Sequence, residues 1–111
     1  MSFNFDQVLK SMVGAAKGVL ETEWPQVQSY VKGATSSYLR DMEELSKLVA
    51  SGEISVEDGQ FLADLHKRSM KMVYTAARGM SGAMAEVAVN SALNAANNAL
   101  GSLFSFPIKL F

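Results

Sequence analysis

The sequence has no cysteine, two prolines and one histidine, and these shortages narrow the possible folds and chemistries. Without cysteine the chain can form no disulfide, no zinc–thiolate site and no thiol nucleophile. The scarcity of proline leaves long stretches in which helices can form without interruption. A carboxylate-bridged metal site needs a Glu-x-x-His motif on two helices, which a single histidine cannot supply. We therefore expect no metal, no cofactor and no catalytic centre.

Charge is also nearly balanced, with a formal net charge of −1. The sequence therefore carries no electrostatic signature of nucleic-acid binding. The first residues lack the basic and apolar regions of a signal peptide, so we expect a cytoplasmic protein or one secreted by a non-classical route. Hydrophobic residues make up 49% of the 111 residues, which favours one folded domain spanning residues 1–111.

Residues 50–58 combine the signals that end one helix with the signals that begin the next. Gly52 suits the positive φ of a helix C-cap. Ser55 suits an N-cap, with Asp58 three residues later as an acidic variant of the capping box. This spacing predicts an αα-hairpin with its turn near residues 51–55. The predicted fold class is all-α, a bundle of three to four helices built on this central hairpin.

Apolar residues recur with the period of a helix along most of the chain. The predicted helices span residues 5–21, 26–50, 55–78 and 83–103. Between the first two, Thr22 can cap a new helix and Pro25 is tolerated in its first turn. We therefore expect a break at this point, the alternative being one kinked helix that runs through it.

Gly79 and Gly82 permit a second break, between the third and fourth predicted helices. A continuous helix over residues 55–103 would be roughly 73 Å long. A compact domain of this size has a radius of gyration of only about 13 Å. The chain therefore either folds back near residues 79–82, or is elongated and buries this long helix in an oligomer.

The predicted 55–78 helix combines an apolar face with a basic one. The residues that share the apolar face are Phe61, Leu62, Leu65, Met72, Val73, Ala76 and Ala77, with Met70 at its edge. The opposite face carries Lys67, Arg68, Lys71 and Arg78. Such a basic face is typical of a solvated helix surface, although an acidic partner or an anionic lipid surface is a possible ligand.

Asp41 and His66 fall on the apolar faces of the two helices that the hairpin brings together. Antiparallel pairing about residue 53 places Asp41 opposite position 65. Burying either side chain alone is costly and shifts its pKa towards the neutral form. We therefore predict a buried hydrogen-bonded pair that locks the two helices. Acid–base catalysis is the alternative, but no nucleophile–base–orienter set accompanies the pair.

Residues 79–111 contain only two charged side chains, Glu86 and Lys109. The helix in this segment combines an asparagine-rich arc with an alanine arc that allows another helix to approach closely. A tail with three phenylalanines follows, and it supplies apolar area of the kind that marks an interface. The residues that we predict to form an interface are Ala88, Ala92, Ala95, Ala96, Ala99, Phe104, Phe106 and Phe111.

Two functions are compatible with this segment. The first is a non-enzymatic assembly protein that forms a homo-oligomer, or binds a helical protein partner, through the alanine-rich helix and the aromatic tail. The second is a membrane-active protein, peripheral or pore-forming, that uses the same segment against lipid. A spanning helix needs about 20 predominantly apolar residues, and the asparagines interrupt that run. The first function is therefore the one we favour.

Overall fold

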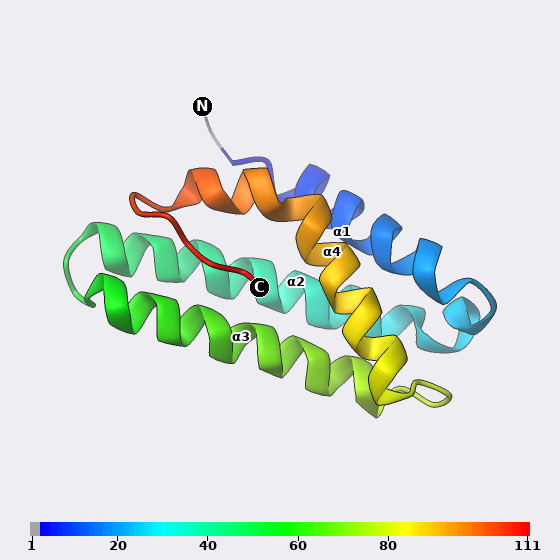
Figure 1. The fold of residues 1–111 in the computed structure, drawn as a ribbon. Helices are drawn as coiled ribbons and strands as arrows, with labels where there is room; N and C mark the ends of the chain where they lie inside the picture. The colour runs from blue at the N-terminus through cyan, green and yellow to red at the C-terminus, as the bar shows by residue number, and fades with distance from the viewer. Residues whose placement is uncertain (1–2) are drawn as a thin grey trace.

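The computed structural model describes residues 3–111 as a four-helix bundle (Figure 1). The helices are α1 (Phe5–Leu20), α2 (Trp24–Ala50), α3 (Val56–Ala76) and α4 (Gly82–Leu103). Successive helices run in opposite directions, and no strand occurs between residues 3 and 111. The predicted all-α bundle is confirmed.

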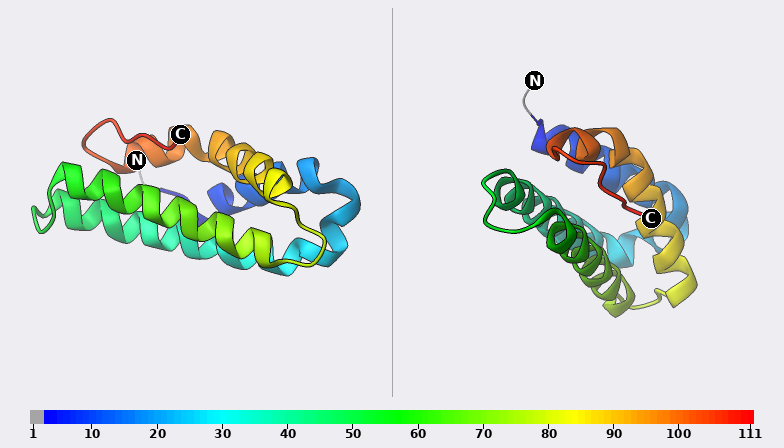
Figure 2. Two further views of the ribbon diagram at one scale, coloured as in Figure 1. Left: turned by 60° about the horizontal axis from the view of Figure 1, so that its bottom comes forward. Right: turned by 60° about the vertical axis from the view of Figure 1, so that its left-hand side comes forward.

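The four helices form two layers, with α1 packed along α4 and α2 packed along α3 (Figure 2). The apolar faces of the two layers meet in the core, where Met12, Leu39 and Leu93 are fully buried. The bundle measures 43 × 25 × 18 Å. The chain therefore folds back between α3 and α4, and the alternative of one long, elongated helix is wrong.

Both ends of the central turn have the predicted geometry. Gly52 has a φ of 78°, which a residue with a side chain rarely adopts. The Ser55 side chain caps α3 by accepting a hydrogen bond of 3.0 Å from the backbone N–H of Asp58. These two local devices reverse the chain within a few residues and make α2 and α3 an antiparallel hairpin.

The break between α1 and α2 is also present, but Thr22 does not cap the new helix. Residues Glu21–Glu23 form a short 3₁₀ turn, and Pro25 lies in the first turn of α2 as expected. The Thr22 hydroxyl donates instead to the carboxylate of Glu23 at 2.9 Å. The predicted helix start at residue 26 is two residues late, because proline's fixed φ suits the first turn of a helix.

The apolar face predicted for α3 is largely exposed and is not the face that the helix buries. Phe61 is 61% exposed and Met72 is 70% exposed. The residues of this region that are buried are Gly59, Ala63, Met70, Tyr74 and Ala77, and of these only Met70 and Ala77 belong to the predicted face. A Cβ atom on Gly59 would lie only 2.7 Å from Cγ2 of Val49 on α2. The two helices therefore approach closely at Gly59, where a side chain would collide with Val49.

Three of the five alanines predicted to meet a partner are buried within their own chain. Ala88, Ala92 and Ala96 are 0% exposed, because α4 turns this side into the bundle. Ala95 is exposed and Ala99 is half-buried. The small side chains do allow close helix packing, but the neighbour is part of the same molecule. The prediction that these three alanines contact a second copy is therefore wrong for this fold.

Ala92 and Ala95 provide a matched test of this arrangement. We expect Ala92→Leu to lower the free energy of unfolding by about 1–3 kcal/mol, because three extra carbons must enter a filled core. Ala95→Leu, on the exposed side of the same helix, should change it by less than about 0.5 kcal/mol. Urea unfolding followed by circular dichroism measures both. Equal effects would contradict the orientation of α4.

Candidate functional site

The aromatic tail that follows α4 docks on α3 of its own chain. The side chain of Gln60 bonds both backbone groups of Lys109, at 2.7 and 2.8 Å. The Lys67 ammonium donates to the carbonyl oxygen of Leu110 at 2.9 Å. Leu110 is buried, which closes this side of the bundle.

The three tail phenylalanines have different surroundings. Phe104 is buried and meets the half-buried Phe106 edge to face, with 5.4 Å between the ring centroids. Phe111 remains 60% exposed, with the Lys67 ammonium 5.9 Å from its ring centroid. Of the tail residues predicted to form an interface, only Phe111 is therefore largely accessible.

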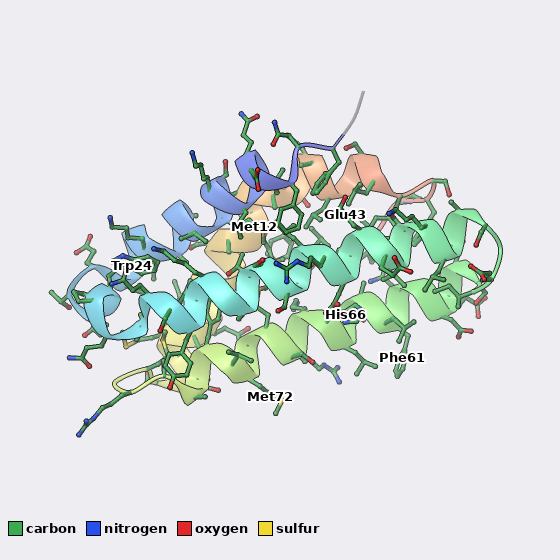
Figure 3. The ribbon with its side chains drawn as sticks, turned by 180° about the vertical axis from the view of Figure 1, so that it is seen from behind. Met12, Trp24, Glu43, Phe61, His66 and Met72 are labelled. Atoms are coloured by element: carbon green, nitrogen blue, oxygen red, sulfur yellow. The ribbon has the colours of Figure 1, made fainter. Side chains whose placement is uncertain are left out.

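The most exposed apolar surface lies instead on the outer side of α3. Phe61, Leu65 and Met72 are 61%, 37% and 70% exposed. At about 100° per residue they fall within about 40° of one another around the helix axis. Figure 3 shows Phe61 and Met72 pointing away from the body of the bundle. We call these three residues the α3 stripe; Phe61 and Met72 are mostly exposed, whereas Leu65 is mostly covered by its own chain.

A groove between α2 and α3 adjoins the α3 stripe. It has a volume of about 460 Å³, and Tyr30 and Val73 form part of its apolar wall. Tyr30 and Val73 are themselves 44% and 42% exposed. The apolar surface therefore extends from the α3 stripe across the groove to α2.

Asp41 and His66 meet at the edge of this groove, but they are not buried. The His66 Nδ1 atom lies 3.6 Å from Oδ2 of Asp41, and the His66 ring lies between α2 and α3 (Figure 3). The Asp41 side chain is 52% exposed and the His66 side chain 29% exposed. Asp41 and His66 lie close together as predicted, but 3.6 Å is too long for the predicted hydrogen bond, and the predicted burial of the pair is wrong. A polar contact this exposed adds little stability, because water screens it.

The polar lock between the hairpin helices is formed by Tyr74 and Thr35 instead. The Thr35 hydroxyl donates to the carbonyl oxygen of Val31 at 2.6 Å, so at 2.7 Å it accepts from the Tyr74 hydroxyl. Burial raises the pKa of Tyr74 to about 12, although the bond to Thr35 opposes the shift. The sequence pattern did not indicate this pair, since threonine and tyrosine are common in helices without being paired.

Tyr38 is also buried, but its hydroxyl has no hydrogen-bond partner within the described residues. Burial raises the pKa of Tyr38, and the negative charge of Asp64 raises it further. The two buried tyrosines therefore differ in one respect, which is whether the hydroxyl is paired.

Removing the hydroxyl should lower the stability of the protein at Tyr74 but not at Tyr38. Tyr74→Phe should lower the free energy of unfolding by about 0.5–1.5 kcal/mol, the net value of a paired hydroxyl. Tyr38→Phe should leave it unchanged or raise it, because the variant no longer buries an unpaired polar group. Chemical denaturation of the two variants measures the difference. A larger loss for Tyr38→Phe would contradict the assignment.

The predicted basic face of α3 is divided by contacts within the chain. Lys71 forms an ion pair with Glu86 of α4, and the hydrogen bond and charge of Lys71 lower the pKa of Glu86. Lys67 donates a hydrogen bond to the tail at Leu110, as described above. Arg68 and Arg78 remain exposed.

Neither a metal site nor a membrane span emerges from the described part of the chain. Within residues 3–111 no three acidic or histidine side chains gather closely enough to hold a metal ion. None of the helices described there is both long and apolar enough to cross a membrane. No family model, curated protein or solved structure matches the chain. Functional inference therefore depends on the surfaces described above.

Proposed function

We propose that this protein is a non-enzymatic assembly protein whose copies associate through the α3 stripe. The observation that carries the proposal is the exposure of Phe61, Leu65 and Met72 on one side of a helix in an otherwise well-packed bundle. Single exposed apolar residues are common on protein surfaces, whereas contiguous apolar patches mark interaction sites. The adjoining groove enlarges this apolar surface and gives it a concave part.

The charges of α3 favour a second copy of the same helix as the partner. Its N-terminal half carries Glu57, Asp58 and Asp64, whereas the exposed basic residues towards its other end are Arg68 and Arg78, which form no ion pair within residues 3–111. Two copies of α3 in antiparallel orientation bring the acidic half of each against the basic half of the other. A parallel arrangement would place like charges together, which is repulsive.

A twofold axis gives this pairing a defined register. In a twofold interface, residue i contacts residue j of the partner and residue j contacts residue i. With the axis between positions 66 and 67, Phe61 meets Met72 of the second copy. Leu65 then packs on the aliphatic part of Arg68 of the second copy. The guanidinium of that Arg68 reaches Asp64 of the first copy. Each apolar contact in this register occurs twice.

The α3 stripe supports a protein partner better than a lipid surface. Helices that lie on membranes combine an apolar face with flanking lysines and arginines. Here the acidic residues of the N-terminal half flank the same stripe, and they would repel anionic headgroups. Membrane binding is therefore the alternative outcome in the experiment below.

Met72→Glu tests the interface without disturbing the core, because Met72 is 70% exposed. Each buried contact of this kind contributes roughly 1.5 kcal/mol or more and occurs twice, so we expect the dimer Kd to rise about 100-fold. Val87→Glu is the matched control, since Val87 is 52% exposed on α4. Sedimentation equilibrium over a concentration series measures both constants.

A charge exchange tests the antiparallel register itself. Arg68→Glu should weaken the dimer, because it brings a carboxylate towards Asp64 of the second copy. Combining it with Asp64→Lys should restore the dimer, because attraction across the twofold axis returns with reversed signs. A wild-type chain that stays monomeric at high concentration would overturn the proposal. Binding to lipid vesicles without a defined oligomer would favour the membrane alternative.

A further inference from the structure

A second groove lies where the two layers meet, between α1 and the first turns of α2. Its volume is about 470 Å³, within the range of small-molecule sites. The apolar part of its lining is formed by Leu9, Val13 and Trp24. Its polar part consists of three lysines and one glutamine: Lys10, Lys17, Lys32 and Gln28. The groove therefore combines an apolar floor with a positively charged rim.

The three lysines of this rim have no acidic partner in the groove. No acidic residue lines the groove, and within residues 3–111 none of its three lysines takes part in an ion pair. The Lys17 ammonium lies 6.0 Å from the centroid of the Trp24 ring, at the outer limit of a cation–π contact. Three like charges around one apolar hollow make the site electrostatically complementary to an anion.

Gly14 keeps the groove open. It lies on α1 between Lys10 and Lys17, and a Cβ atom built on it would meet nothing within 4 Å. Glycine weakens a helix interior by about 1 kcal/mol relative to alanine, so the backbone gains no stability from it here. A larger side chain at this position would extend into the space between the two lysines.

We propose that this groove binds a small amphipathic anion, namely a medium- or long-chain carboxylate. The alkyl chain would lie on Leu9, Val13 and Trp24, and the carboxylate would be bound by the lysines of the rim. An uncharged alkyl chain would leave the lysines without a counterion, and a small inorganic anion would leave the apolar floor exposed to water. Only a ligand with both parts satisfies both surfaces.

Trp24 makes the proposal directly measurable, because it is the only tryptophan in the sequence. Decanoate, titrated below its micelle concentration, should produce a saturable change in tryptophan emission. Acetate and decanol, which each supply one half of the ligand, should bind at least 10-fold more weakly. Raising the salt concentration should weaken decanoate binding, because salt screens the lysines. The absence of a saturable response to decanoate would overturn the proposal.

Gly14→Leu and Gly18→Leu separate binding in the groove from non-specific adsorption. Both glycines are exposed on α1 with nothing within 4 Å of an added Cβ, but only Gly14 lines the groove. Leucine favours the helix at both positions, so neither variant should unfold. We expect Gly14→Leu to lower decanoate affinity at least 10-fold, while Gly18→Leu binds like the wild type. Equal binding by both variants would refute the site.

The lysines are tested separately from the apolar floor. Lys10→Gln combined with Lys32→Gln should weaken decanoate binding at least 10-fold, while Lys17 stays in place beside Trp24. Lys47→Gln, near the far end of α2, removes a charge outside the groove and should have no effect. If the two lining lysines can be removed without loss of affinity, the anion is not bound at the rim. Because α1 and the α3 stripe are separate, these results do not depend on self-association.

Discussion

The close approach of α2 and α3 at Gly59 is the constraint on which the rest of the structure depends. Val49 occupies the space where any larger residue at position 59 would place its side chain. Gly59 therefore faces α2, whereas Phe61, Leu65 and Met72 lie on another side of α3 and are exposed. The same orientation of α3 places Tyr74 in the core, where its hydroxyl bonds Thr35 of α2.

The exposed surface of the hairpin follows from this orientation of α3. With Gly59, Met70 and Tyr74 inside, α3 presents Phe61, Leu65 and Met72 to solvent. Asp41 and His66 lie at the edge of the groove between α2 and α3 and not in the core. Lys67 and Gln60 face the other side, where they hold the tail. One orientation of α3 therefore determines both which of its residues are buried and which are exposed.

The tail and α4 illustrate how a self-association signal in a sequence can be satisfied within one chain. The alanines of α4 allow close packing, as their size indicates, but the helix that uses them is in the same bundle. Likewise, Phe104 and Leu110 find apolar neighbours without a second copy. The apolar residues Phe61 and Met72 of α3 remain exposed. The lysine-rimmed groove between α1 and α2 shares no lining residue with α3 or the tail.

Local interactions along the sequence were sufficient to predict the helices and their turns. Gly52, Ser55, Pro25 and Gly79 act on their immediate neighbours through φ preferences and capping, so the all-α hairpin bundle was predictable. The proximity of Asp41 and His66 was also predictable, because the hairpin fixes which positions lie opposite each other. The face that α3 buries was not, because α3 is apolar on two sides and periodicity cannot rank them. Tertiary contacts between the two helices decide it, among them the close approach of Gly59 to Val49 and the hydrogen bond between Tyr74 and Thr35.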